Sequence, residues 1–307
     1  MLKYRKYYYT LSSVLVVASI ISLAVVGLNF GIDFTGGGVM EVNFKSERPN
    51  HEQVRVALAD VDLGETIIQD IGPSGLILRF KNIDEAVHQE ALNKFEGLGE
   101  FEELRFESIG PVIGAETKRK SIWAILLVLV AILVYIAWAF RRISFPLKSW
   151  KYGIVALITL FHDVLITVGV FSIISHFLGI EMGVPFVAAL LTIFGYSVND
   201  TIVIFDRIRE NVLRQGSTFD FAEVINKSVR QTYVRSLNTS LTTLFVLLAI
   251  FLFGGITIKY FVLALIIGVS VGTYSSLFLA SPLLFSWSVV KLNKSSFRRP
   301  AKEARRN

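Results

Sequence analysis

Among the ionisable residues inside, or at the edge of, long apolar runs, three are candidates for a function: Asp163, Asp200 and Arg235. A charged side chain costs about 2.5–3.5 kcal/mol at the centre of a membrane helix, so such groups face protein or a cavity and indicate a function. Asp200 precedes Asp206 by six residues, or about 9 Å along a helix. Asp200 is therefore expected inside the hydrocarbon, short of its midplane.

Arg235 enters the membrane from the same side on the next span, so we expect it to meet Asp200. A carboxylate–guanidinium contact that forms and breaks changes the affinity of the carboxylate for a proton. A proton crossing the membrane field gains about 2.3 kcal/mol per 100 mV, so the pair predicts a proton relay. A supporting polar network is expected from Asn199, Thr201, Asn238, Thr239 and Asp163. The alternative is that these groups only hold helices together and that Arg235 extends to the interface.

The composition is that of a membrane protein. Of 307 residues, 53% are apolar and 18% are charged, against about 25% charged in soluble proteins, and the mean hydropathy is +0.56. The absence of cysteine excludes disulfides, thiolate zinc sites and cysteine nucleophiles. Six apolar runs approach or exceed the roughly 20 residues that span a bilayer: 10–30, 121–140, 152–179, 182–205, 236–258 and 260–290. They predict a polytopic α-helical membrane protein, with Pro282 bending or ending the sixth helix.

Lys and Arg gather before the first run, between the second and third, between the fourth and fifth, and after the sixth. Because positively charged loops stay in the cytoplasm, both termini are expected there. The predicted organisation has four parts: a cytoplasmic N-terminus with the first helix at 1–30, an extracytoplasmic domain at 31–120, five helices at 121–290, and a basic cytoplasmic tail at 291–307.

The extracytoplasmic segment holds 17 acidic and 10 basic residues, a net charge of −7. Its residue pattern predicts strands at 39–44, 65–71, 76–80 and 101–108 and helices at 51–61 and 83–95. The order β-α-β-β-α-β is that of a ferredoxin-like α+β domain. His51 and His88 are expected to be solvated rather than to bind a metal.

No motif indicates an enzyme. The three glycines 36–38 lack the Lys-Ser/Thr of a phosphate loop, and are expected to be a flexible exit from the first helix into the first strand. Neither Gly-x-Ser-x-Gly nor His-Glu-x-x-His occurs. We therefore expect no catalytic residue, no metal site and no bound cofactor.

Four motifs are specific in combination: GIDFTGG at 31–37, FHDVLIT at 161–167, GYSVNDTIVIFDRIREN at 195–211 and NTSLTT at 238–243. With them the chain resembles the SecF family of protein-export membrane proteins, part of the SecDF complex in the RND superfamily. The resemblance covers nearly the whole chain. It implies an RND-type half of six transmembrane helices in the bacterial plasma (inner) membrane, in contact with lipid.

The resemblance also implies partners and a role. Members pair with SecD as a heterodimer, associate with the SecYEG channel and in some cases YajC, and bind no nucleic acid. They use the proton motive force to promote late translocation or release of unfolded polypeptide. Asp200 and Arg235 match the family's proton pathway, to which SecD adds a second Asp. The coupling ion implied is H⁺, although a carboxylate amid hydroxyls and amides also suits Na⁺.

Two other functions fit the same features. An RND-type exporter half for a lipid or small molecule would carry the same buried Asp and outer domain. A non-coupling scaffold of the channel would need neither charge to change its protonation. The partners that copurify with the chain distinguish an exporter half from an export subunit. The variant Asp200→Asn distinguishes a scaffold, which would tolerate the substitution.

Overall fold

The computed structural model describes residues 1–141, 148–215 and 220–296. The chain forms two compact units. An outer unit comprises residues 30–123 and 181–184, and a membrane unit comprises 1–29, 124–180 and the residues from 185 onward. Of the predicted basic tail, residues 297–307 lie outside the described residues.

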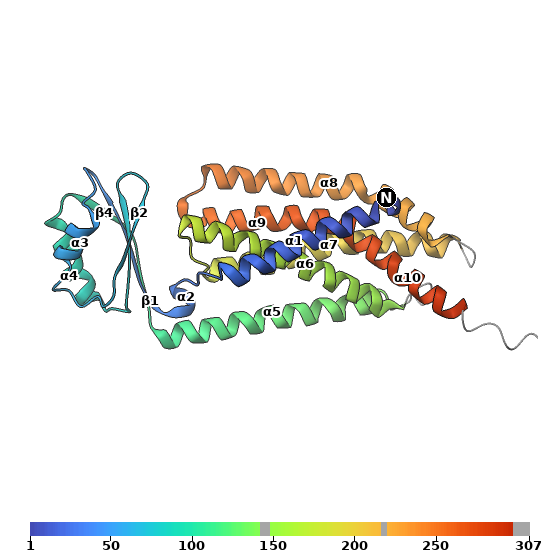
Figure 1. Cartoon of the computed structure of the whole chain (residues 1–307), viewed down its shortest axis with the longest axis horizontal. Helices are drawn as coiled ribbons and strands as arrows, with labels where there is room; N and C mark the ends of the chain where they lie inside the picture. Colours follow the sequence, from blue (N-terminus) through green and yellow to red (C-terminus); the bar gives the residue numbers. More distant parts are fainter. Residues whose placement is uncertain (142–147, 216–219, 297–307) are drawn as a thin grey trace, which may run out of the picture. The chain divides into compact units, whose positions relative to one another are not determined.

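The predicted set of six transmembrane helices is confirmed (Figure 1). Among the described residues, six helical stretches are long and apolar enough to cross a membrane. They are formed by α1 (Arg5–Val25), α5 (Pro111–Ala139), α6 (Ser149–Leu178), α7 (Val184–Gln215), α8 (Phe221–Phe253) and α9 (Ile256–Ser275) with its continuation.

Helices α7 and α8 extend beyond the predicted apolar runs into charged stretches of the sequence. The predicted span stops at residue 205 because charges begin at Asp206, yet α7 continues to Gln215. Charge ends an apolar run but not a helix, since pairs such as Arg209–Asp206 at 3.1 Å sit on one helix face. α8 begins fifteen residues before the predicted run, where the side chain of Asp220 accepts the N–H of Ala222 at 2.8 Å.

The sixth span is divided into three helical segments. α9 runs into a π-helical turn at Ser276–Ala280, and α10 (Ser281–Ser296) follows directly. Pro282 is the second residue of α10, where its missing N–H removes one backbone hydrogen bond to the preceding turn. The helix therefore changes its winding before Pro282 and continues past it.

Small residues allow the membrane helices to approach one another. α6 packs against α1 and α9, and α9 also packs against α8. A Cβ at Gly169 of α6 would lie 2.4 Å from Cβ of Ser19, and Ser22 donates to the carbonyl of Gly169 at 3.0 Å. Packing of this kind, rather than burial from water, holds helices together in lipid.

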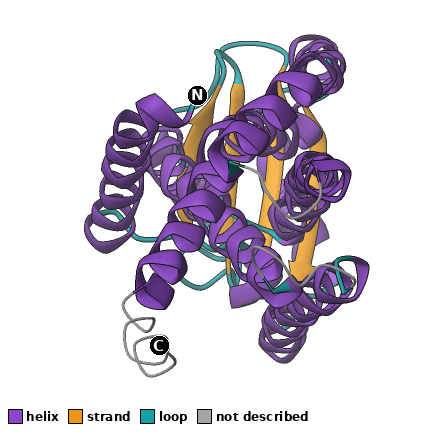
Figure 2. Ribbon diagram, turned by 90° about the vertical axis from the view of Figure 1, so that its right-hand side faces the viewer, coloured by secondary structure: helices purple, strands orange, loops and turns teal. Residues whose placement is uncertain are grey.

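The outer unit contains the predicted ferredoxin-like domain. Its elements are β1 (Gly37–Phe44), α3 (His51–Ala57), β2 (Ile67–Ile71), β3 (Gly75–Phe80), α4 (Glu85–Glu96) and β4 (Phe101–Ile109), after a short helix α2 (Ile32–Thr35). The strands, drawn in orange in Figure 2, form one four-stranded antiparallel sheet. Its order is β2-β3-β1-β4. α3 and α4 cover the same face of it (Figure 1).

Alternating apolar residues of the strands form the core of this domain with the two helices. Met40, Val42 and Phe44 of β1 are buried, and Phe95 of α4 packs among them. Asn50 begins α3 with a capping box.

The expectation that both His51 and His88 are solvated is wrong for His88. His88 is 5% exposed. It stacks on Phe106 with ring centroids 3.6 Å apart, and its Nε2 lies 2.7 Å from Oε1 of Glu103. The sequence shows only the polar stretch of α4 around His88 and not the β4 residues that cover it. His51 is exposed as expected, and it contacts Asp70 at 2.7 Å.

The glycine segment before β1 is closely packed, contrary to the expectation of a flexible exit. Gly36 has φ +74°, and a Cβ there would lie 2.7 Å from Cα of Pro111. A Cβ at Gly114, on the first turn of α5, would lie 2.7 Å from the backbone nitrogen of Gly36. Glycine is needed here because two backbones meet without room for side chains.

Candidate functional site

Asp200 lies near the middle of α7 and is 4% exposed. Ser236 and Ser240 of α8 lie beside its carboxyl group. Among the described residues, the Oδ2 atom of Asp200 and the hydroxyl of Ser236 are buried and have no hydrogen-bond partner. Buried polar atoms are almost always satisfied, so this carboxyl group has the capacity to accept a proton or another donor.

Arg235 is the residue before Ser236 on α8, and its side chain is exposed. It is near enough to Asp200 to attract its charge. Within the described residues, however, no ion pair joins Asp200 to Arg235. The structure thus brings the two predicted relay residues to neighbouring helices without the direct contact that the sequence predicts.

The predicted supporting residues divide into two groups. Asn199, Asn238 and Thr239 are exposed on α7 and α8. The hydroxyl of Thr239 donates to carbonyl oxygens of its own helix, at 3.1 Å and 3.0 Å. Thr201 and Asp163 are buried, and both belong to an interhelical network.

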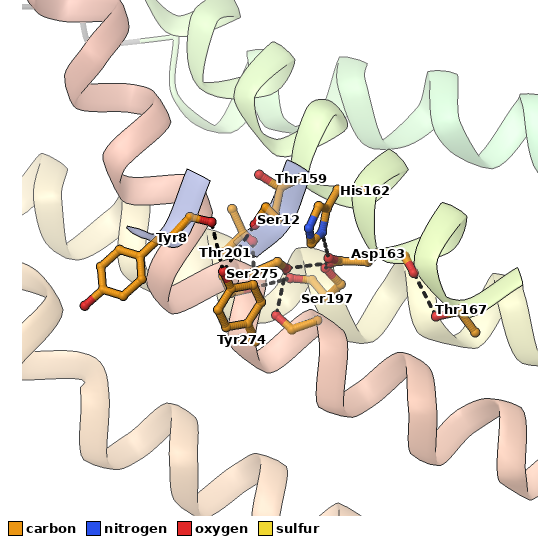
Figure 3. Close-up of polar contacts among 12 residues, drawn as sticks. Tyr8, Ser12, Thr159, His162, Asp163, Thr167, Ser197, Thr201, Tyr274 and Ser275 are labelled. Carbon is orange, nitrogen blue, oxygen red and sulfur yellow. Dashed lines mark hydrogen bonds and ion pairs between the residues drawn. The ribbon is translucent and has the colours of Figure 1, made fainter. Parts of the chain in front are cut away.

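Asp163 is the centre of that network (Figure 3). Its side chain is fully buried on α6. Its Oδ1 lies 2.9 Å from Nδ1 of His162, while Oδ2 accepts hydrogen bonds from Ser197 of α7 at 2.6 Å and from Ser275 of α9 at 2.7 Å. One carboxylate therefore joins three membrane helices.

The network continues along α7 and α9. Thr201 is 2.9 Å from Ser276 of the π-helical turn, and Ser276 donates to the carbonyl of Ser197 at 3.2 Å. On the side of α8, Ser240 accepts from Tyr196 at 3.1 Å and from Thr273 at 2.8 Å. Polar contacts thus extend from Asp163 to the neighbours of Asp200.

Sequence reasoning missed the contribution of α9. Ser275 and Ser276 follow Gly272 and Thr273 in a span that is otherwise apolar, and this cluster of small and hydroxyl residues was the available signal. A Cβ at Gly272 would lie 3.1 Å from Cβ of Ser197 and 3.6 Å from Oδ2 of Asp163. The glycine therefore lets α9 reach the carboxylate.

A second group of contacts, within the outer unit, holds the loop that precedes α7. Gly31 donates to the carbonyl of Met182 at 3.0 Å, and Asp33 accepts the N–H of Val184, the first residue of α7, at 2.7 Å. Arg79 of β3 forms an ion pair with Glu181, Nε to Oε1 2.5 Å. Burial raises the pKa of Glu181, and the Arg79 guanidinium partly offsets that rise.

The described residues contain no group of three or more His, Asp or Glu side chains placed to hold a metal ion. The buried polar side chains of the membrane unit described above carry carboxyl, imidazole and hydroxyl groups, which are able to accept or donate protons.

Comparison with known proteins gives matches over nearly the whole chain. Protein translocase subunit SecF of Thermobaculum terrenum is 45% identical over 302 residues, covering 93% of this chain and 92% of the relative. The corresponding subunit of Vibrio alginolyticus is 39% identical and covers 94% and 90%.

Solved structures of SecDF also match this chain. The crystal structure of SecDF, a translocon-associated membrane protein from Thermus thermophilus, matches with a TM-score of 0.80 at 32% identity, over 94% of this chain and 38% of that one. SecDF in its super-membrane-facing form matches with a TM-score of 0.68 at 32% identity, over 97% and 40%. The chain thus spans less than half the length of each SecDF chain.

Family models match two regions of the chain. The model for the C-terminal part of protein export membrane proteins SecD and SecF matches residues 88–290, and the SecD/SecF GG motif matches residues 21–47. The second region includes the packed glycine segment and Asp33. The chain belongs to the SecD/SecF family of protein-export membrane proteins.

Proposed function

We propose that this chain is an accessory subunit of the Sec protein-export machinery that works with SecD and is not an enzyme. In this role it uses an ion gradient to promote late translocation or release of unfolded polypeptide. The family membership and the match over about nine-tenths of each SecF relative support the export role.

Asp200 carries the proposal of ion coupling. Its buried Oδ2 atom has no hydrogen-bond partner among the described residues, and hydroxyl groups surround it. A carboxyl group in this state gains from taking up a proton, which removes a charge from the membrane interior. Arg235 lies on the adjacent helix α8, and a guanidinium favours the ionised state of a nearby carboxyl group, so movement between α7 and α8 would alter proton binding.

SecD is the partner proposed for the polar surface of α7 and α8. The exposed residues of this surface are Asn199, Arg235, Asn238, Thr239 and Thr242. Polar groups of this kind avoid lipid and face other helices. A second six-helix half would cover them and add the second Asp of the relay, and the SecDF relatives hold more than twice the matched length in one chain.

The remaining assignments follow from the same role. The coupling ion is H⁺, with Na⁺ as the other ion that this donor set suits. The membrane is the bacterial inner membrane, with both termini cytoplasmic because the basic segments flank that side. SecYEG is the channel partner, with YajC as a further subunit, and lipid surrounds the helices.

The test uses vesicles that contain this chain, SecD and the channel. A stalled export substrate is followed to completion after ATP removal, with a proton gradient, with a Na⁺ gradient, or with neither. Asp200→Asn keeps the size of the side chain and removes its ionisation. Asp206→Asn is the matched control, because Asp206 lies on the same helix but is about half exposed and pairs with Arg209.

We expect gradient-driven completion in the wild type and in Asp206→Asn, and its loss in Asp200→Asn, with assembly unchanged. Equal completion in all three would refute ion coupling through Asp200 and would favour the scaffold. Copurification with a different partner and transport of a lipid would favour the exporter half.

A further inference from the structure

We infer that His162 and Asp163 form a second protonation site in the membrane unit, separate from Asp200, which takes up one proton on Nε2 of His162. The site deepens the proposed function, on which its role in export rests. The existence of the site rests on its own geometry.

The hydrogen bonds define which atom is left to bind a proton. Asp163 accepts from Ser197 and Ser275 through Oδ2, and its Oδ1 lies 2.9 Å from Nδ1 of His162. With Asp163 ionised, its oxygens only accept, so Nδ1 carries the hydrogen and Nε2 is the nitrogen with a free lone pair. Nε2 is buried and has no hydrogen-bond partner among the described residues, in a side chain that is 6% exposed.

In that ionised state Asp163 has no permanently charged partner among the described residues. Within the described residues, His162 is the one basic side chain at ion-pair distance from Asp163. The other titratable groups nearby are Tyr274 of α9, with its ring 6.4 Å from that of His162, and Asp200, one turn beyond Ser197 on α7. From α1, Tyr8 contributes only its carbonyl oxygen, which accepts from Tyr274 at 3.2 Å.

One proton changes the pair from net negative to net neutral. With Nδ1 protonated in both states, the added proton goes to Nε2 and converts the imidazole to imidazolium beside the carboxylate. Neutralising the pair removes a net charge from a low-dielectric interior, which favours uptake. The imidazolium would also compete with Ser197 and Ser275 for the carboxylate.

This competition gives the site a route to Asp200. Ser197 and Asp200 lie three residues apart on α7, which is about 4.5 Å along the helix. Ser275, which donates to the same Oδ2 atom, adjoins the π-helical turn at Ser276–Ala280, and such turns are frequent at functional sites. Proton uptake at His162 would therefore loosen contacts that fix α7 and α9 around the main relay.

The first test is a nuclear magnetic resonance titration of the complex with SecD, with this chain labelled at histidine ring nitrogens. The chain has four histidines, and His162→Gln identifies the signals of His162. We expect these signals to change from the neutral Nδ1–H form to the doubly protonated form as the pH is lowered. A ring of His162 that stays neutral over the whole titration would overturn the inference. The measurement keeps Asp163 as it is, so it does not depend on the folding of a variant at that position.

The second test compares the pH dependence of gradient-driven export in His162→Gln and His176→Gln. His176 is the matched control, because it lies on the same helix but is exposed. We expect the curve of export rate against pH to be displaced in His162→Gln. Where occupancy of the His162 site by a proton limits export, each pH unit of displacement corresponds to about a tenfold change in rate. His176→Gln should keep the wild-type curve. Wild-type profiles for both variants would overturn the role of the site.

The two proposals fail in different ways. If Asp200→Asn abolishes gradient-driven export while His162 stays neutral, the proposed function stands and this inference is overturned. If His162 titrates while Asp200→Asn exports normally, the second site stands and coupling through Asp200 is refuted.

Discussion

Substitution of Gly36 by alanine should strongly destabilise the packing of the outer unit. Gly36 has φ +74° and ψ 169°, a backbone region that is open in practice only to glycine and costs other residues about 1–3 kcal/mol. The new Cβ would also lie 2.7 Å from Cα of Pro111. Overpacking of this kind costs about 1–3 kcal/mol, so the two effects together predict a loss of about 2–6 kcal/mol.

Gly72 provides the matched control in the same unit. It has φ +60°, and a Cβ there would meet nothing within 4 Å. Gly72→Ala therefore carries only the cost of a left-handed backbone, about 1–2 kcal/mol. The difference between the two variants reports the close approach of the glycine segment to the start of α5, together with the more restricted backbone region of Gly36.

Hydrogen exchange of the full chain measures the prediction. The amides of β1 and β4 report the free energy of opening of the sheet, and those of α6 report the membrane unit. We expect faster exchange in β1 and β4 for Gly36→Ala than for Gly72→Ala, with α6 unchanged. Equal exchange in the two variants would show that the glycine segment tolerates a side chain and that its packing is not a constraint.

Two further substitutions test the contacts around α7. Arg79→Met leaves Glu181 half-buried without its guanidinium, which should raise the pKa of Glu181 further. Because the folded state then binds more protons than the unfolded one, stability should fall as the pH rises above the ordinary glutamate value of about 4.3. The loss of stability should be about 1–3 kcal/mol at neutral pH, less than for a fully buried pair. It is measured by hydrogen exchange of the Val184 amide, and a loss of protection that does not depend on pH would contradict the prediction. Gly272→Ala places a Cβ 3.1 Å from Cβ of Ser197 and should cost about 1–3 kcal/mol, measured as a lowered thermal midpoint. Gly195→Ala, with nothing within 4 Å of its Cβ, should leave that midpoint unchanged.

The sequence predicts the elements well because each has a local signal. Apolar length marks the membrane helices, and the alternation of β1 and the turn between β2 and β3 mark the outer domain. The errors lie where distant residues decide. Gly36 and its neighbours resemble a flexible linker until Pro111, 75 residues later, occupies the space beside them. His88 resembles a surface residue until β4 supplies Phe106 and Glu103.

The candidate site shows the same limit. The cost of burying charge singles out Asp163 and Asp200 from the sequence alone. Their partners cannot be found in that way, because Ser197 and Ser275 are 34 and 112 residues from Asp163. Arg235 was expected to contact Asp200 from depth alone, but depth does not fix the face of a helix, and its side chain is exposed on α8.

Helix α7 connects the two groups of contacts that the family motifs specify. Its first residue, Val184, donates to Asp33 of the glycine segment, and sixteen residues later the same unbroken helix carries Asp200. That is about 24 Å of continuous helix. An α-helix resists stretching because backbone hydrogen bonds close each turn, so Val184 and Asp200 keep a fixed separation along α7. The same helix also bonds to Asp163 through the hydroxyl of Ser197, one turn from Asp200. If Asp200 binds a proton as proposed, the change in charge therefore falls on the same helix whose first residue bonds to Asp33.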